Sequence, residues 1–254
     1  MRRDFSRRAA SVIKNTALVA WKHTKNVPIK ENNAVQHWLD RVPALRDWLD
    51  NQARDWWIKG VVRGRCREHH QLRGHERFLK ESITTEYEKI KASHSYRVVD
   101  TRSQTHISLA SLVLATYKTL IPFLKDEQQV QGIIAEHMGA RTTPMFVALM
   151  KIASWFQSNP YESLKGRLHA LRIDYGNGFQ TQVEQGPFLS KLTIEKCLYH
   201  EIFTSESVSH LTSCCCCSQD KVYLEAAPSP RVLAGLVKSK GLGDSECCFV
   251  VQKM

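Results

Sequence analysis

The side chains best suited to chemistry in this 254-residue chain are cysteines near its C-terminus. They are Cys197, the run Cys214–Cys217, Cys247 and Cys248, with Cys66 standing apart. A cysteine thiolate is both a covalent nucleophile and a metal ligand. Four consecutive cysteines suit a disulfide framework poorly, because neighbouring side chains point in different directions. We therefore expect reduced thiols in an intracellular compartment.

Polar groups stand close to these cysteines in the sequence. The local features are, in order, Lys196-Cys197-Leu198-Tyr199-His200, Cys217-x-x-Asp220, Arg231 and Gly243-Asp244-x-x-Cys247-x-Phe249. Together they resemble the L-2-amino-thiazoline-4-carboxylic acid hydrolase family, in which a cysteine-bearing helix precedes a Cys-x-x-Asp element and a terminal strand reads Gly-Asp-x-x-Cys-x-Phe. The resemblance covers the residues from Leu192 to the C-terminus, about a quarter of the chain.

The resemblance implies a hydrolase acting at a carbon–nitrogen bond other than a peptide bond, the C=N bond next to sulfur in a small cyclic amidine or thiazoline, and so opening the ring. Such a reaction needs a nucleophile, a proton carrier and a cation for the substrate carboxylate. We expect Cys217 to be the nucleophile, with Cys197 as the second choice. Asp220 is the expected general base and His200 the proton shuttle. Arg231 is the expected clamp, because a guanidinium binds a carboxylate bidentately.

A metal site is the alternative use of the same residues. The candidate ligands of zinc or iron are Cys197, Cys217, Asp220 and Cys247. An open position on such an ion would activate water, whereas a closed site would make a non-catalytic metal- or small-ligand-binding module. An inactive family member is a further alternative. The simplest one is that Cys197 and Cys247 are small buried hydrophobes, as free cysteines often are.

Helical periodicity dominates the first 160 residues. Apolar positions recur at helical spacing in Ser6–Lys25, Ala34–Val62, Phe78–Ala92, Thr105–Leu124 and Glu127–Phe156. The last two ranges are the most apolar, so we expect them in the core. Polar residues and Pro122 interrupt Ile107–Leu124, and no apolar run approaches the roughly 18–20 residues of a membrane span. We therefore expect no membrane-spanning segment.

The C-terminal third mixes strands with one helix. We expect strands at Phe179–Glu184, Val222–Ala226 and Cys247–Val251, a helix at Leu192–Phe203, and a loop over Gly235–Gly243. The predicted fold class is α+β, with an N-terminal helical region packed on a small antiparallel β unit that carries a cysteine-bearing helix. We expect three regions. Residues 1–30 form a basic extension, residues 31–160 are helical, and residues 161–254 are α+β. The last two form either one continuous domain or two.

The formal net charge of +11 invites a nucleic-acid hypothesis. The basic residues are interspersed with acids and accompany no groove-reading motif, so we favour a small carboxylate substrate over nucleic acid. The Arg-rich first 22 residues have the composition of a transit peptide, which keeps a mitochondrial or plastid location open. We expect an intracellular protein, cytoplasmic in preference to organellar.

Overall fold

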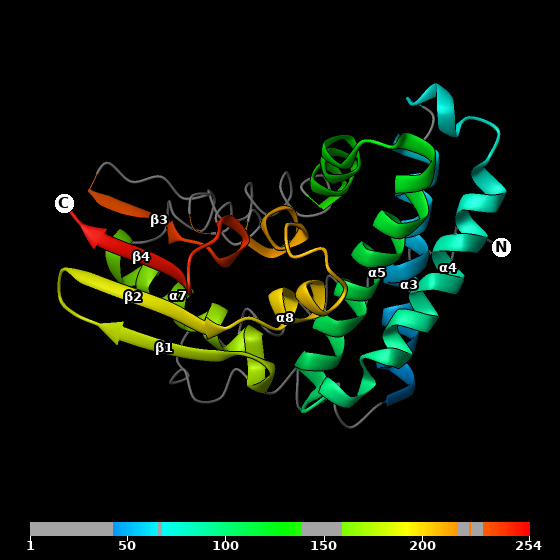
Figure 1. The fold of residues 1–254 in the computed structure, drawn as a ribbon. Helices are drawn as coiled ribbons and strands as arrows, with labels where there is room; N and C mark the ends of the chain where they lie inside the picture. Colours follow the sequence, from blue (N-terminus) through cyan, green and yellow to red (C-terminus); the bar gives the residue numbers. More distant parts are fainter. Residues whose placement is uncertain (1–42, 66–67, 139–158, 218–223, 225–230) are drawn as a thin grey trace, which may run out of the picture. The chain divides into compact units, whose positions relative to one another are not determined.

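A computed structural model describes residues 43–65, 68–138, 159–217, 224 and 231–254 (Figure 1). Contacts divide the chain into two compact units, residues 1–49 and 50–254. The candidate site and the elements that position it belong to the second unit. The predicted extension 1–30 and its helix Ser6–Lys25 lie outside the described residues, and so do Asp220 and most of the predicted strand Val222–Ala226.

Helices make up most of the described chain before the sheet. Their bounds are α3 Pro43–Gly60, α4 Glu76–Ser93, α5 Thr101–Leu124 and α7 Pro160–Tyr175, and residues 127–138 are also helical. Short 3-10 or π-helical turns are η2 Val61–Arg65, η3 His70–Leu72, η4 Ser95–Arg97 and η5 Gly176–Gly178. The helices predicted at Phe78–Ala92 and Thr105–Leu124 are confirmed as α4 and α5.

The long helix α5 lies at the centre of this unit and contacts α4, α7 and α8 (Leu198–Ser205). It begins at a capping box: the Asp100 carboxylate accepts the Ser103 N–H at 2.7 Å, and the Ser103 hydroxyl accepts the Asp100 N–H at 2.9 Å. It is also the one described helix that is long and apolar enough to cross a membrane, and 72% of that apolar window is buried inside the structure. Such burial is the property of a core helix.

A four-stranded antiparallel sheet completes the unit, so the predicted α+β class is correct. The strands are β1 Gln180–Gln185, β2 Leu189–Lys196, β3 Val232–Lys238 and β4 Cys247–Lys253, in the spatial order β1-β2-β4-β3. Helix α7 packs against all four strands (Figure 1). The Tyr161 hydroxyl on α7 donates to the Gly186 carbonyl at 2.6 Å, which fixes the helix to the turn between β1 and β2.

Two sequence predictions in this region are wrong. The range Leu192–Phe203 is not one helix, because β2 runs to Lys196 and α8 begins only at Leu198. Leu192 and Ile194 are buried while their neighbours are not, which is the period of a strand with one face in the core. The predicted loop over Gly235–Gly243 is half strand, since β3 extends to Lys238. The predicted strands at Phe179–Glu184 and Cys247–Val251 are confirmed as β1 and β4.

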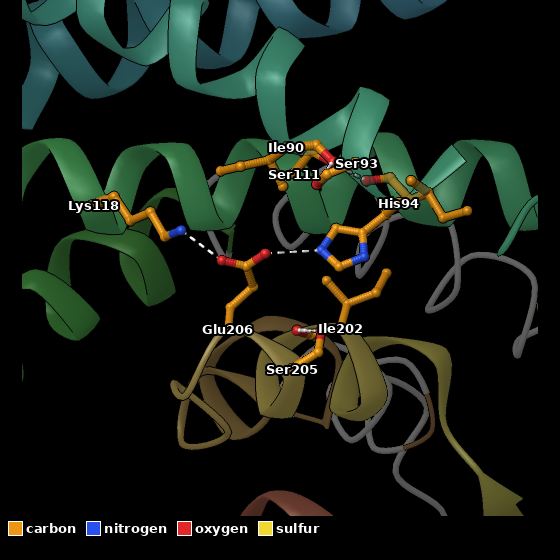
Figure 2. A network of polar contacts seen from close by, with 9 residues as sticks. Ile90, Ser93, His94, Ser111, Lys118, Ile202, Ser205 and Glu206 are labelled. Atoms are coloured by element: carbon orange, nitrogen blue, oxygen red, sulfur yellow. Dashed lines mark hydrogen bonds and ion pairs between the residues drawn. The ribbon is translucent and has the colours of Figure 1, made fainter. Parts of the chain in front are cut away.

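A polar network joins α8 to the helical part of the unit (Figure 2). Glu206, directly after α8, accepts from Lys118 of α5 through one carboxylate oxygen. Its other oxygen lies 3.1 Å from Nε2 of His94, the residue that ends α4. The His94 side chain is 5% exposed and that of Glu206 is 22% exposed, so solvent screens these pairs only in part. The network therefore holds α8 against α4 and α5.

Replacing Glu206 by glutamine tests this network through stability. The hydrogen bond from Lys118 is the largest cause that lowers the pKa of Glu206 below its ordinary 4.5, and His94 adds to it. A carboxyl whose pKa is lower in the folded protein stabilises the fold above the unfolded pKa and loses that effect as the pH falls. In urea unfolding at pH 7 we expect Glu206→Gln to lower the free energy of unfolding by about 1–2 kcal/mol.

The difference between wild type and Glu206→Gln is expected to shrink as the pH falls below 4.5. Glu184→Gln is the matched control, because Glu184 and Lys191 form a pair in which the glutamate is 69% exposed. That control is expected to stay within about 0.5 kcal/mol of wild type. A Glu206→Gln variant as stable as the control at pH 7 would show that the network contributes no stability.

Candidate thiol site

Three elements bring four cysteine side chains together beside α8. Cys197 is the residue before α8, Cys216 and Cys217 end the π-helical turn η6 (Ser213–Cys217), and Cys247 begins β4. Ile194 of β2 pairs with Cys247, so the chain that leaves β2 towards Cys197 starts next to it. Figure 1 shows α8 between the strands and α5.

The sulfurs of this group lie near one another. The Cys216 Sγ lies 3.9 Å from the Cys217 Sγ, and the Cys216 thiol donates to the Thr212 carbonyl at 3.6 Å. Cys197 raises the pKa of Cys216, and Cys216 and then Cys247 lower the pKa of Cys217. Cys217 is 5% exposed and Cys247 is 2% exposed. The structure thus brings together three of the four predicted metal or nucleophile residues and adds Cys216, which the sequence motif did not single out.

Hydrogen bonds concentrate negative charge on one of these sulfurs. The thiols of Cys216 and then Cys247 lower the pKa of Cys217 to about 3, although burial opposes them. The Ser239 hydroxyl, which donates to the Cys217 Sγ at 3.2 Å, and the Gly241 N–H lower this pKa further. Cys217 is therefore a thiolate at neutral pH.

The neighbouring cysteines keep their protons. Hydrogen bonding with Cys197 and then with Cys217 raises the pKa of Cys216 well above its usual value, and bonding to Cys217 is the largest cause that raises the pKa of Cys247. Cys214 belongs to the same turn, but its thiol donates to the Leu211 carbonyl at 3.3 Å, and burial raises its pKa to about 11. The Cys217 thiolate thus lies beside the protonated thiols of Cys216 and Cys247.

The turn after β3 supplies the donors to this thiolate. It comprises Ser239, which is 1% exposed, and η7 (Lys240–Leu242). The Asp244 carboxylate accepts the Ser239 N–H at 2.7 Å, which fixes the start of the turn. The Lys240 N–H donates to the Cys247 Sγ at 3.3 Å. The Ser239 hydroxyl and the N–H groups of Lys240 and Gly241 point at sulfur, as in an anion-binding turn.

Gly241 allows this turn to lie against η6. A Cβ at position 241 would meet the backbone nitrogen of Ser213 at 2.6 Å, closer than any side chain tolerates. Sequence analysis missed Ser239 and Gly241, although Gly243 and Asp244 of the same turn were part of the motif. A signal was present: a Ser-Lys-Gly-x-Gly-Asp stretch next to a cysteine strand has the composition of a turn that brings its backbone close to a partner.

His200 lies on α8 within electrostatic range of the thiolate. Its Nδ1 is 3.3 Å from the Thr212 hydroxyl oxygen, which orients the ring. Burial is the largest cause that lowers the pKa of His200, followed by the Lys240 charge, while Cys217 raises it. The imidazole is therefore neutral at pH 7 and able to accept a proton. The role of His200 as a proton shuttle stays a prediction.

Arg231 does not come to the cysteine cluster. It precedes β3, and its carbonyl accepts the Met254 N–H at 2.9 Å at the far end of the sheet. Ser239 lies after β3, so the seven-residue strand separates the two by roughly 23 Å or more. The expectation that Arg231 clamps a substrate at these cysteines is therefore corrected, because a strand is stiff and longer than an arginine side chain. Lys240 is the cation beside the cluster.

The described residues contain no arrangement that would support the predicted metal site. Among them, no group of three or more His, Cys, Asp or Glu side chains is arranged to hold a metal ion. The predicted ligand and general base Asp220 lies outside the described part of the chain. Zinc or iron binding through Cys197, Cys217 and Cys247 accordingly stays a prediction.

The sequence was compared with protein-family models and with curated proteins. No protein-family model matches the sequence, and no curated protein matches it significantly. The resemblance to the thiazoline hydrolases therefore rests on the motif residues alone.

Proposed function

We propose that this protein is a thiol-dependent hydrolase that opens a small cyclic amidine, such as the thiazoline ring of L-2-amino-thiazoline-4-carboxylate. The observation that carries the proposal is the Cys217 sulfur, which accepts a hydrogen bond from the Ser239 hydroxyl at 3.2 Å. A thiolate is the reactive form of cysteine, and this sulfur is ionised at neutral pH. The motif resemblance supplies the substrate class.

The reaction begins with attack of the Cys217 thiolate on the amidine carbon of the ring. The bond from this carbon to the ring sulfur breaks, and the departing sulfur takes a proton. Water then attacks the carbon attached to Cys217, with His200 accepting a proton from that water. The products are N-carbamoyl-cysteine and the free Cys217 thiolate. His200 suits this step because burial keeps the imidazole neutral.

A carboxylate on the substrate needs a cation near the thiolate, and Lys240 takes the role first expected of Arg231. Its backbone N–H donates to Cys247, which fixes the residue beside the cluster. Its charge also acts on His200. A lysine attracts a carboxylate as a point charge and lacks the bidentate geometry of a guanidinium. The proposed substrate is accordingly small and anionic. An intracellular, cytoplasmic location of the protein stays a prediction, and the protein's reduced thiols fit that location.

The direct test is turnover of L-2-amino-thiazoline-4-carboxylate by the reduced, full-length protein, with mass spectrometry of the product. We expect a product heavier by one water, and at least a 10³-fold loss of turnover in Cys217→Ala, because a covalent nucleophile is removed. Cys214→Ala is the matched control, since Cys214 lies in the same turn and its thiol donates to a backbone carbonyl. Equal turnover in the two variants would exclude Cys217 as the nucleophile.

A non-catalytic metal- or small-ligand-binding module is the second candidate. It rests on the residue types of Cys197, Cys217 and Cys247, since among the described residues no group of three or more such side chains is arranged to hold a metal ion. Thiolates bind zinc and iron tightly. Stoichiometric metal in the purified protein, lost on Cys217→Ala and without any turnover, would support this candidate. Bound metal without turnover would also be expected of an inactive member of the hydrolase family.

A further inference from the structure

The sulfurs of Cys197, Cys216, Cys217 and Cys247 have a second chemical capacity, since neighbouring thiols can be oxidised to a disulfide. None of the seven cysteines among the described residues is in a disulfide. Cys217 and Cys247 lie on elements that are distant in the sequence, yet the donors to their sulfurs are neighbours in one turn. Only a pair of cysteines with suitable geometry can form the disulfide bond.

Geometry selects the pair. Cys216 and Cys217 are consecutive, so their Cα atoms are about 3.8 Å apart, which is shorter than the roughly 4.4–6.8 Å of ordinary disulfides. A bond between neighbours would also strain the peptide that joins them. Cys217 and Cys247 belong to η6 and β4, so neither constraint applies to them. Consecutive residues of one turn also donate to their two sulfurs, Ser239 to Cys217 at 3.2 Å and Lys240 to Cys247 at 3.3 Å.

We propose that hydroperoxides convert Cys217 and Cys247 into a disulfide, which makes this pair a reversible oxidation site. In the first step the Cys217 sulfur attacks one oxygen of hydrogen peroxide, the O–O bond breaks, and hydroxide leaves, giving a sulfenic acid. In the second step the Cys247 sulfur attacks the Cys217 sulfur, the S–O bond breaks, and water leaves. Overall, two thiols and one hydrogen peroxide give one disulfide and two waters.

The turn after β3 favours this sequence of steps. The Ser239 hydroxyl donates to the Cys217 sulfur, and the Lys240 N–H donates to the Cys247 sulfur, so one turn holds both reacting atoms. Cys248 does not compete, because successive strand residues point to opposite faces of the sheet. Oxidation would remove the sulfur that the proposed hydrolase uses, and a dithiol reductant would restore it. The inference rests on sulfur contacts and not on hydrolase activity.

The test uses the full-length, reduced protein treated with hydrogen peroxide, blocked with an alkylating reagent and digested with trypsin without reduction. Cleavage after Lys196, Lys221, Lys240 and Lys253 separates the two cysteines into peptides 197–221 and 241–253. We expect these two peptides linked in wild type and released by dithiothreitol, with two thiols lost per chain. The link should persist in Cys216→Ala, Cys214→Ala and Cys248→Ala, and disappear in Cys217→Ala and Cys247→Ala.

A second readout covers the case in which the alanine variants fail to fold. In Cys247→Ser the sulfenic acid at Cys217 lacks its partner, so dimedone should label Cys217 after peroxide, whereas in wild type it should not. A link retained in Cys217→Ala, a bond confined to peptide 197–221, or no loss of thiols would each overturn the proposal. None of these readings depends on turnover, so they separate this inference from the proposed hydrolase.

Discussion

At pH 5, a small alkylating reagent is expected to modify Cys217 roughly a hundredfold faster than Cys214. The two cysteines belong to one turn and are 5% and 9% exposed, so access is matched. The pKa is about 3 for Cys217 and about 11 for Cys214. At pH 5 nearly all of Cys217 is therefore thiolate, against about one part in 10⁶ of Cys214. The less basic Cys217 thiolate is the weaker nucleophile by 0.4–0.5 log units per pKa unit, which reduces its 10⁶-fold advantage by about 10³·⁶.

The pH profile distinguishes the two thiols further. Alkylation of Cys217 should be flat from pH 5 to pH 8, because its pKa lies below this window and the group is ionised throughout. Alkylation of Cys214 should rise about tenfold per pH unit over the same window. The rates are followed by peptide mass spectrometry with limiting iodoacetamide. A Cys217 rate that also rises tenfold per unit would mean that its proton is not removed by the surrounding donors.

Replacing Gly241 by alanine is expected to lower the free energy of unfolding by about 1–3 kcal/mol. The added Cβ would lie 2.6 Å from the backbone nitrogen of Ser213, and backbone cannot turn aside as a side chain can. The turn η7 must therefore move away from η6. That movement withdraws the Ser239 hydroxyl and the Gly241 N–H from Cys217, so the pKa of Cys217 should rise and its alkylation at pH 5 should slow.

Gly166→Ala is the matched control, because a Cβ at this position on α7 meets no atom within 4 Å. In a helix interior alanine is favoured over glycine by about 0.5–1 kcal/mol, so this variant should be slightly more stable than wild type. Thermal or urea unfolding and Cys217 alkylation are measured on both variants. If Gly241→Ala matches Gly166→Ala in both measurements, the close approach of the two turns is not needed for the site.

Local patterns in the sequence predicted much of the secondary structure. The 3.6-residue repeat identified α4 and α5, and alternation identified β1, because each repeat states which face of an element is buried. Prediction failed where a short segment resembled a helix. Ile194, Cys197, Leu198 and Ile202 fit related helix faces, yet the chain changes from β2 to α8 at Cys197. Pairing with β4, at Leu192 with Phe249, decides between helix and strand.

The sequence by itself determined the reactive residue types and the short motifs that contain them: clustered cysteines, a histidine one helical turn after Cys197, and a glycine-rich turn before Cys247. Only the tertiary structure decided which sulfur carries the charge. The pKa of Cys217 is lowered by its neighbour Cys216, then by the thiol of Cys247 on β4 and by a hydroxyl 22 residues away in the chain. It also decided against Arg231, which a rigid strand holds away from the cluster. Hydrogen bonds and charges act through distances in space, and those distances are set by packing between segments that the sequence order separates.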